Sequence, residues 1–246
     1  MTFWTSIASA KCASNGIYCL STSSKLNRNG LIILEFYASS QHLVPGLNQK
    51  HQIYLTSRGK KVHLMVLETL KGEMNVTQVV FKPSSDLNAN EVYKLEISNL
   101  PADERNPTRY NRSSGKWEAL TFEISTKIDR EMPTFNIVPT QQKKTLAFYG
   151  CGPASWVYFN VAGNDSSELF VRVNVKNRTT KKVTTYLLSI EDRLIKVGHG
   201  MCSGAFVFDN GDNFEAEFQL VDQSGNQSKA TTAITFTKPI NETEEE

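Results

Sequence analysis

The sequence predicts an all-β protein made of two tandem immunoglobulin-like antiparallel β-sandwiches. Three observations predict it: apolar and polar residues alternate with a period of two, glycine and proline turns recur at short intervals, and helical periodicity is almost absent. Successive side chains of a strand point to opposite faces, so each alternating segment would bury one face and expose the other. A chain of 246 residues also fits two domains of about a hundred residues each.

Four segments carry the clearest alternation and are expected to form half-buried strands. Their expected core residues are Val62, Leu64 and Val66; Tyr93, Leu95 and Ile97; Val171, Val173 and Val175; and Phe214, Ala216, Phe218 and Leu220. Turn signals separate the segments, for example Asn29-Gly30, Pro45-Gly46, Lys71-Gly72, Asn210-Gly211 and Ser224-Gly225. Strands at this spacing are typical of a sandwich, whereas a βαβ fold would need helices between them.

The predicted boundary between the two sandwiches lies in the charged stretch Lys127 to Pro133. Proline cannot donate to a sheet ladder and therefore favours a linker or the first residue of a strand. We expect a first β-sandwich domain over residues 23–128 and a second, immunoglobulin-like one over residues 133–240, each folding independently.

The amino-terminal segment, residues 1–22, resembles a clipped signal peptide. Met1 to Ala10 are uncharged and end in Ala8-Ser9-Ala10, the small-x-small pattern that signal peptidase recognises; an ordinary loose amino terminus is the alternative. The strongest apolar run, Leu31 to Leu34, is closed by Glu35 and is too short for a membrane helix. We therefore expect no transmembrane segment.

The cysteines suggest an oxidising compartment. Cys151 and Cys202 each lie in a glycine-rich junction, and a bridge between them would close a loop of about fifty residues, with a useful entropic gain. Cys12 and Cys19 form a second candidate pair, in a segment that processing would remove. Disulfides persist outside the cytoplasm, so a secreted, periplasmic or cell-surface location is expected.

No catalytic, metal or cofactor site is assigned from the sequence. His199 lies near Cys202, but no third group is evident to orient the histidine, so a cysteine enzyme remains only a remote alternative. Asp209, Asp212 and Glu215 are oxygen-rich but lack the distal glutamate of a calcium loop. With 27 basic and 25 acidic residues and no long basic run, a nucleic-acid partner is not expected.

Trp156 and Tyr158 are the candidate binding residues. They share one face of a predicted strand, and Val157, Phe159 and Val161 share the other. Exposed aromatic rings suit sugar stacking or protein contacts. The alternative is a central strand whose outer face is also covered, so that both sets pack in a core.

Three segments resemble the bacterial immunoglobulin-like (Big) modules found in tandem on secreted and surface proteins. Leu87 to Ile97 resembles their penultimate strand, in which a turn leucine precedes an inward tyrosine. Asp209 to Phe214, leading into Phe218 to Asn226, is similar to their strand ending in Asp-x-x-Gly-Asn, and Asp129 to Pro133 is similar to their short entry segment. The resemblance implies the fold and a surface location, and it implies no activity.

Together these features predict a non-catalytic binding or adhesion module, secreted or in the cell envelope, that recognises a protein or a glycan. A structural spacer or accessory region of an envelope assembly is the alternative.

Overall fold

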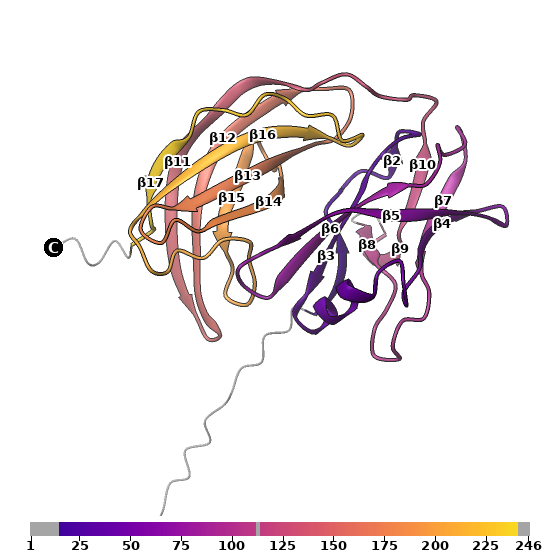
Figure 1. The fold of residues 1–246 in the computed structure, drawn as a ribbon, viewed down its shortest axis with the longest axis horizontal. Coiled ribbons are helices and arrows are strands. Elements are labelled where there is room, and N and C mark those ends of the chain that lie inside the picture. Colours follow the sequence, from indigo (N-terminus) through magenta and orange to yellow (C-terminus); the bar gives the residue numbers. More distant parts are fainter. Residues whose placement is uncertain (1–14, 112–113, 241–246) are drawn as a thin grey trace, which may run out of the picture.

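A computed structural model describes residues 15–111 and 114–240, and within these ranges the protein is all-β, as predicted (Figure 1). The N-terminal half contains β1 (Gly16–Cys19), β2 (Lys25–Leu26), β3 (Ile32–Tyr37), the 3-10 helix η1 (Ala38–Gly46), β4 (Ile53–Ser57), β5 (Lys60–Lys71), β6 (Val76–Pro83), β7 (Val92–Ile97), β8 (Thr108–Asn111), β9 (Lys116–Ala119) and β10 (Thr121–Ile124). The C-terminal half contains β11 (Thr134–Tyr149), β12 (Gly152–Asn164), β13 (Leu169–Asn177), β14 (Val183–Ser189), β15 (Leu194–His199), β16 (Asn213–Asp222) and β17 (Ile234–Thr237).

The N-terminal half is not built from two separate sheets. Its strands form one ten-stranded sheet in the order β2-β10-β7-β4-β5-β6-β3-β1-β8-β9. The 12-residue strand β5 is the reason, because residues 60–63 pair with β4 and residues 64–71 pair with β6. A strand that joins both layers makes the sheet curl around its core instead of separating into a sandwich.

The alternating segments of the N-terminal half behave as predicted in β7 but not in β5. Tyr93, Leu95 and Ile97 are buried in β7. On β5, Leu64 is buried but Val66 is 37% exposed, and the register with β6 shifts directly after Val66, before Glu68. Such a shift changes the face to which the following side chains point.

The C-terminal half is a two-layer sandwich. The sheet β11-β12-β15 faces the sheet β14-β13-β16-β17, and the predicted inward residues of β13 and β16 are all buried. The Phe159 ring of β12 packs against the Phe218 ring of β16, with centroids 4.9 Å apart. Phe236 of β17 contacts Phe159 from the same layer as Phe218, with ring centroids 5.7 Å apart.

Strands β3 and β6 form a wall that both halves share. Leu34 and Phe36 point into the N-terminal core, whereas Leu31 and Ile33 belong to the core of the C-terminal sandwich. On β6, Val80 also joins that second core. The C-terminal half therefore completes its core with residues from the N-terminal half, and the division into domains at residues 23–128 and 133–240 stays a prediction.

The Gln78 side chain ties the shared wall to the edge strand β14. Its Nε2 donates to Leu187 O at 3.0 Å, and Leu187 N donates to its Oε1 at 3.1 Å. Gln78 is fully buried. The amide thus replaces one residue of a neighbouring strand and satisfies backbone groups that would otherwise be buried without partners.

The turn between β5 and β6 reaches the C-terminal half and forms a second attachment (Figure 1). The Glu73 carboxylate accepts hydrogen bonds from Val207 N at 2.6 Å and from Thr184 Oγ1 at 2.5 Å. Met74 and Gly204 exchange both backbone hydrogen bonds, at 3.1 and 2.9 Å. The two halves are therefore joined by paired backbone and side-chain contacts as well as by apolar packing.

We expect Phe218→Ala to lower the free energy of unfolding by about 3–5 kcal/mol, because it removes a fully buried ring from the sandwich core. Glu217→Ala, on the exposed face of the same strand, should change it by less than about 0.5 kcal/mol. Urea unfolding of both variants measures the difference. Equal losses would contradict the register of β16.

We expect Gln78→Leu to destabilise the whole protein by about 2–4 kcal/mol, because it leaves a buried N–H and a buried C=O of Leu187 without partners. Gln142→Leu, at an exposed position of β11, is the matched control. Urea unfolding measures both variants, and a neutral Gln78→Leu change would show that the amide does not stabilise the contact between the halves.

Candidate functional site

Trp156 and Tyr158 lie on the outer face of β12, the central strand of its three-stranded sheet. The inward residues Val157, Phe159 and Val161 are completely buried in the sandwich core. Trp156 and Tyr158 are only half-buried, so part of each ring remains accessible to solvent. We call this pair the aromatic platform.

The strands on either side of β12 determine what surrounds the platform. Tyr158 is opposite Lys143 on β11 and Lys196 on β15. Directly opposite residues of neighbouring strands present their side chains on the same face of a sheet. The platform therefore has a lysine on each side of its tyrosine.

Trp156 has smaller neighbours, Thr145 on β11 and Gly198 on β15. Gly198 has a φ of +146°, and a Cβ at this position would lie 2.0 Å from Ser155 O. Only glycine fits so close to the β12 backbone in this conformation. As a result, no β15 side chain stands beside the indole at this position.

The two lysines beside Tyr158 differ in their charge partners. Lys196 Nζ contacts Glu191 at 2.9 Å, and the hydrogen bond to Glu191 is the main cause that raises the pKa of Lys196. Lys143 Nζ lies 4.8 Å from the centre of the Tyr158 ring and forms no ion pair with a described residue. Lys143 is thus the cation of the platform that no carboxylate of the described residues neutralises. The sequence pattern alone did not identify either lysine.

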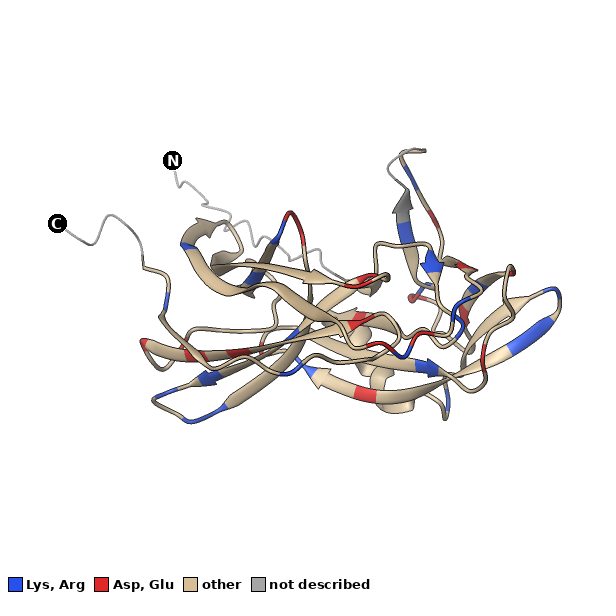
Figure 2. Cartoon of the chain, turned by 90° about the horizontal axis from the view of Figure 1, so that it is seen from above, with Lys and Arg blue, Asp and Glu red and all other residues tan. Residues whose placement is uncertain are grey.

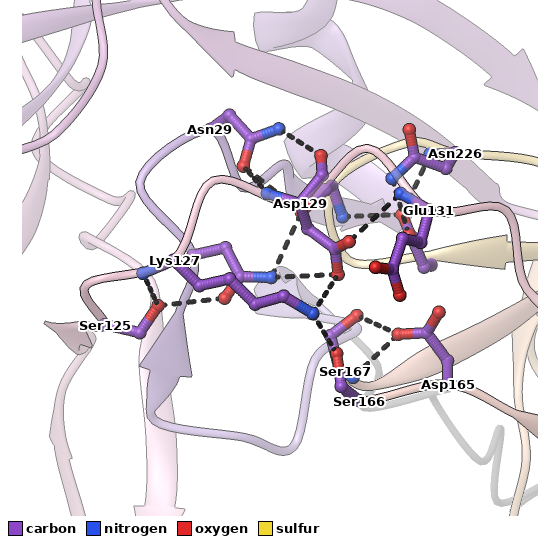
Figure 3. A network of polar contacts seen from close by, with 12 residues as sticks. Asn29, Ser125, Lys127, Asp129, Glu131, Asp165, Ser166, Ser167 and Asn226 are labelled. Carbon is purple, nitrogen blue, oxygen red and sulfur yellow. Dashed lines mark hydrogen bonds and ion pairs between the residues drawn. The ribbon is translucent and has the colours of Figure 1, made fainter.

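Three carboxylates meet where the linker touches the C-terminal sandwich. One oxygen each of Asp129, Asp165 and Asp222 lies within 4.8 Å of the others. Figure 3 shows protein groups around Asp129 and Asp165: Lys127 Nζ lies 3.6 Å from Asp129 Oδ2, and Asp165 Oδ1 accepts hydrogen bonds from Ser167 N and Oγ at 2.7 and 2.8 Å. We therefore interpret this cluster as a structural junction.

Asp222 also organises the turn that the sequence identified between the last two strands. Its Oδ1 accepts hydrogen bonds from Ser224 N and Asn226 N, both at 2.8 Å, and Gly225 has a φ of +88°. Burial raises the pKa of Asp222, although these hydrogen bonds lower it. The turn contacts the N-terminal half, since Leu31 N donates to Gln223 O at 2.6 Å.

In the loop around Asp209, the carboxylates of Asp212 and Glu215 form ion pairs with different cations and do not converge on a shared site. Asp212 pairs with Lys238 at 2.7 Å, and Glu215 pairs with Arg178 at 3.1 Å. Asp209 lines a pocket of about 510 Å³ between the two halves. The pocket's other lining residues include Glu73, Asn177, Lys182 and Phe214.

The predicted pairing of Cys151 with Cys202 gains no support. The structure contains no disulfide between Cys151 and Cys202, although β12 begins just after Cys151 and Cys202 is buried. Cys19 is a thiol whose pKa is raised by burial to about 11, and Cys12 lies outside the described residues. His199, the histidine considered as a base, has Nδ1 2.9 Å from Gly200 O.

A half-buried carboxylate, Glu35, lies beside Gln78 in the contact between the halves. It accepts hydrogen bonds from Tyr37 OH at 2.8 Å and from Gln78 Nε2 at 3.3 Å. Burial raises the pKa of Glu35, and the polar groups of Tyr37, Tyr186 and Gln78 offset this only in part. The ionised form therefore destabilises the folded protein at neutral pH.

We expect Glu35→Gln to stabilise the protein at pH 7, because the amide removes a partly desolvated charge while keeping its hydrogen-bonding shape. The folded-state pKa lies above that of the unfolded chain, so the gain should shrink as the pH falls and vanish below about pH 4. Urea unfolding of both proteins across this range tests the prediction. A gain that grows toward acid pH would contradict it.

Charged residues of both signs are interspersed over the two halves (Figure 2). Among the described residues, no helix has the length and apolar content that a membrane span requires.

No protein-family model and no curated protein matches the chain. Among solved structures, it is similar to the pullulanase from Anoxybacillus sp. LM18-11 (TM-score 0.25, 9% identity, 87% of this chain and 25% of that chain). It is also similar to pullulanase type I from Bacillus subtilis str. 168 complexed with maltose (TM-score 0.25, 10% identity, 89% and 25%). A third similar structure is the N-terminal part of the bacterial S-layer protein SbsC (TM-score 0.27, 8% identity, 92% and 44%). The chain spans about a quarter of the length of the pullulanases.

Proposed function

We propose that this chain is a non-catalytic binding module of a secreted or cell-envelope protein, and that it binds a glycan on the aromatic platform. The observation that carries the proposal is the orientation of Trp156 and Tyr158. They are half-buried on the outer face of a central strand whose inward residues already fill the core. The two rings are therefore not required to complete the sandwich.

The physical chemistry of the platform favours a sugar over a small apolar ligand. Sugar rings present C–H groups on their faces and hydroxyls around their edges, so they need a flat aromatic surface with polar neighbours. Trp156 and Tyr158 supply the surface, and Thr145, beside Trp156, supplies a hydroxyl. Because the rings stand on a paired strand, little conformational entropy is lost when a ligand binds.

The same proposal includes the finer form of the fold, a tandem of immunoglobulin-like modules at the cell surface. The two-sheet C-terminal sandwich and its Asp222 to Asn226 turn support it. The curled N-terminal sheet would then be a divergent module.

A structural spacer in an envelope assembly is the second candidate function. The attachments through Gln78 and Glu73 favour it, because they fix the two halves against each other as a spacer requires. A spacer needs no exposed aromatic pair, so binding at the platform separates the two functions.

We expect Trp156→Ala and Tyr158→Ala each to weaken binding of an array-selected glycan by about tenfold or more, about 1.4 kcal/mol, because each removes one stacking surface. Trp117→Ala is the matched control, since Trp117 is a 59% exposed tryptophan on β9 of the other half. Titration calorimetry measures affinity and thermal melting confirms folding. A blank array, or equal losses in all three variants, would reject the platform as the binding site.

A further inference from the structure

We propose that the platform selects an acidic glycan, one bearing carboxylate or sulfate groups, and that Lys143 is the residue that confers this preference. The inference rests on the proposed function, since it names the chemical class of ligand for the same platform.

Lys143 is placed at the platform by an irregularity in β11. The register between β11 and β12 shifts between Gln141 and Lys143, so that Gln141 is opposite Phe159 and Lys143 is opposite Tyr158. An extra residue in one strand redirects the side chains that follow it. Here it places a cation, in place of Gln142, over the ring.

The Lys143 ammonium covers part of the surface on which a ligand would stack. Its Nζ lies 4.8 Å from the centre of the Tyr158 ring, within the range of a cation–π contact. A neutral sugar that stacks on Tyr158 must displace the ammonium and gives it no charged partner in return. An acidic sugar displaces it equally but offers a carboxylate or sulfate as a new partner.

The other charges around the ring leave Lys143 as the available cation. Lys196, on the opposite side of Tyr158, is held by Glu191 and also interacts with Asp192. Lys144, the next residue of β11, donates to Thr237 Oγ1 at 2.7 Å. Lys143 is exposed and its charge is not neutralised by any described carboxylate, so an anionic ligand would pair with it first.

Two matched pairs of polysaccharides test the inference. Polygalacturonate is compared with its methyl ester, and dextran sulfate with dextran, so that only the charge differs within each pair. We expect the intact protein to bind the acidic member of one pair roughly fivefold more tightly at low salt, the upper range for an exposed ion pair. The preference should fall at about 0.5 M salt. Which pair shows it distinguishes carboxylate from sulfate.

Lys143→Gln should abolish the preference and retain the affinity for the neutral member, whereas Lys143→Arg should keep the preference. Lys60→Gln, at an exposed lysine of β5 in the N-terminal half, is the control and should change nothing. Equal affinity for both members in the intact protein, or a preference that survives Lys143→Gln, would overturn this inference while leaving glycan binding intact. Absence of binding to every polysaccharide would overturn the proposed function as well.

Discussion

The contact of Gln78 with Leu187 is the constraint on which the arrangement of the two halves depends. A β-sheet edge can be buried only if its free N–H and C=O groups find partners, and at the edge of β14 a single amide provides both. This contact allows β14 to lie against β6, and β14 in turn aligns β13 and β16 through their registers. The apolar residues Leu31, Ile33 and Val80 can then enter the C-terminal core. The amide thus satisfies the buried backbone groups of Leu187 while the apolar side chains pack around it.

Alternation along the chain predicted the strands of the C-terminal half well, because β13 and β16 each have one buried and one wet face. It failed for the arrangement of the N-terminal half, where β5 pairs with different partners along its length. Alternation reports only which residues face inward, so it cannot reveal that one strand belongs to two layers. The run Leu31 to Leu34 is buried on both faces, and its lack of polar residues is a sequence signal of this burial that we used only to exclude a membrane helix. What covers its second face depends on residues more than a hundred positions away.

In the candidate site, too, the sequence revealed residues on one strand but not contacts between strands. Trp156 and Tyr158 could be found from the sequence because they sit on one strand at a spacing of two. Lys143 could not, because its position over Tyr158 depends on a register shift in a neighbouring strand. The junction of Asp129, Asp165 and Asp222 was also missed, since its members come from three distant segments that meet only after folding. Local pattern identifies residues that share a strand, whereas groups that cross strands depend on register.

The shared wall also affects how the chain reaches its native state. A ribosome completes β3 and β6 long before it makes β14, and Gln78 is separated from Leu187 by 109 residues. Until β14 emerges, the newly made N-terminal half exposes Ile33 and Val80 together with the Gln78 amide, whose oxygen still lacks the Leu187 N–H. A surface of this kind promotes association between unfinished chains. Formation of β14 therefore covers a surface that otherwise favours association between unfinished chains.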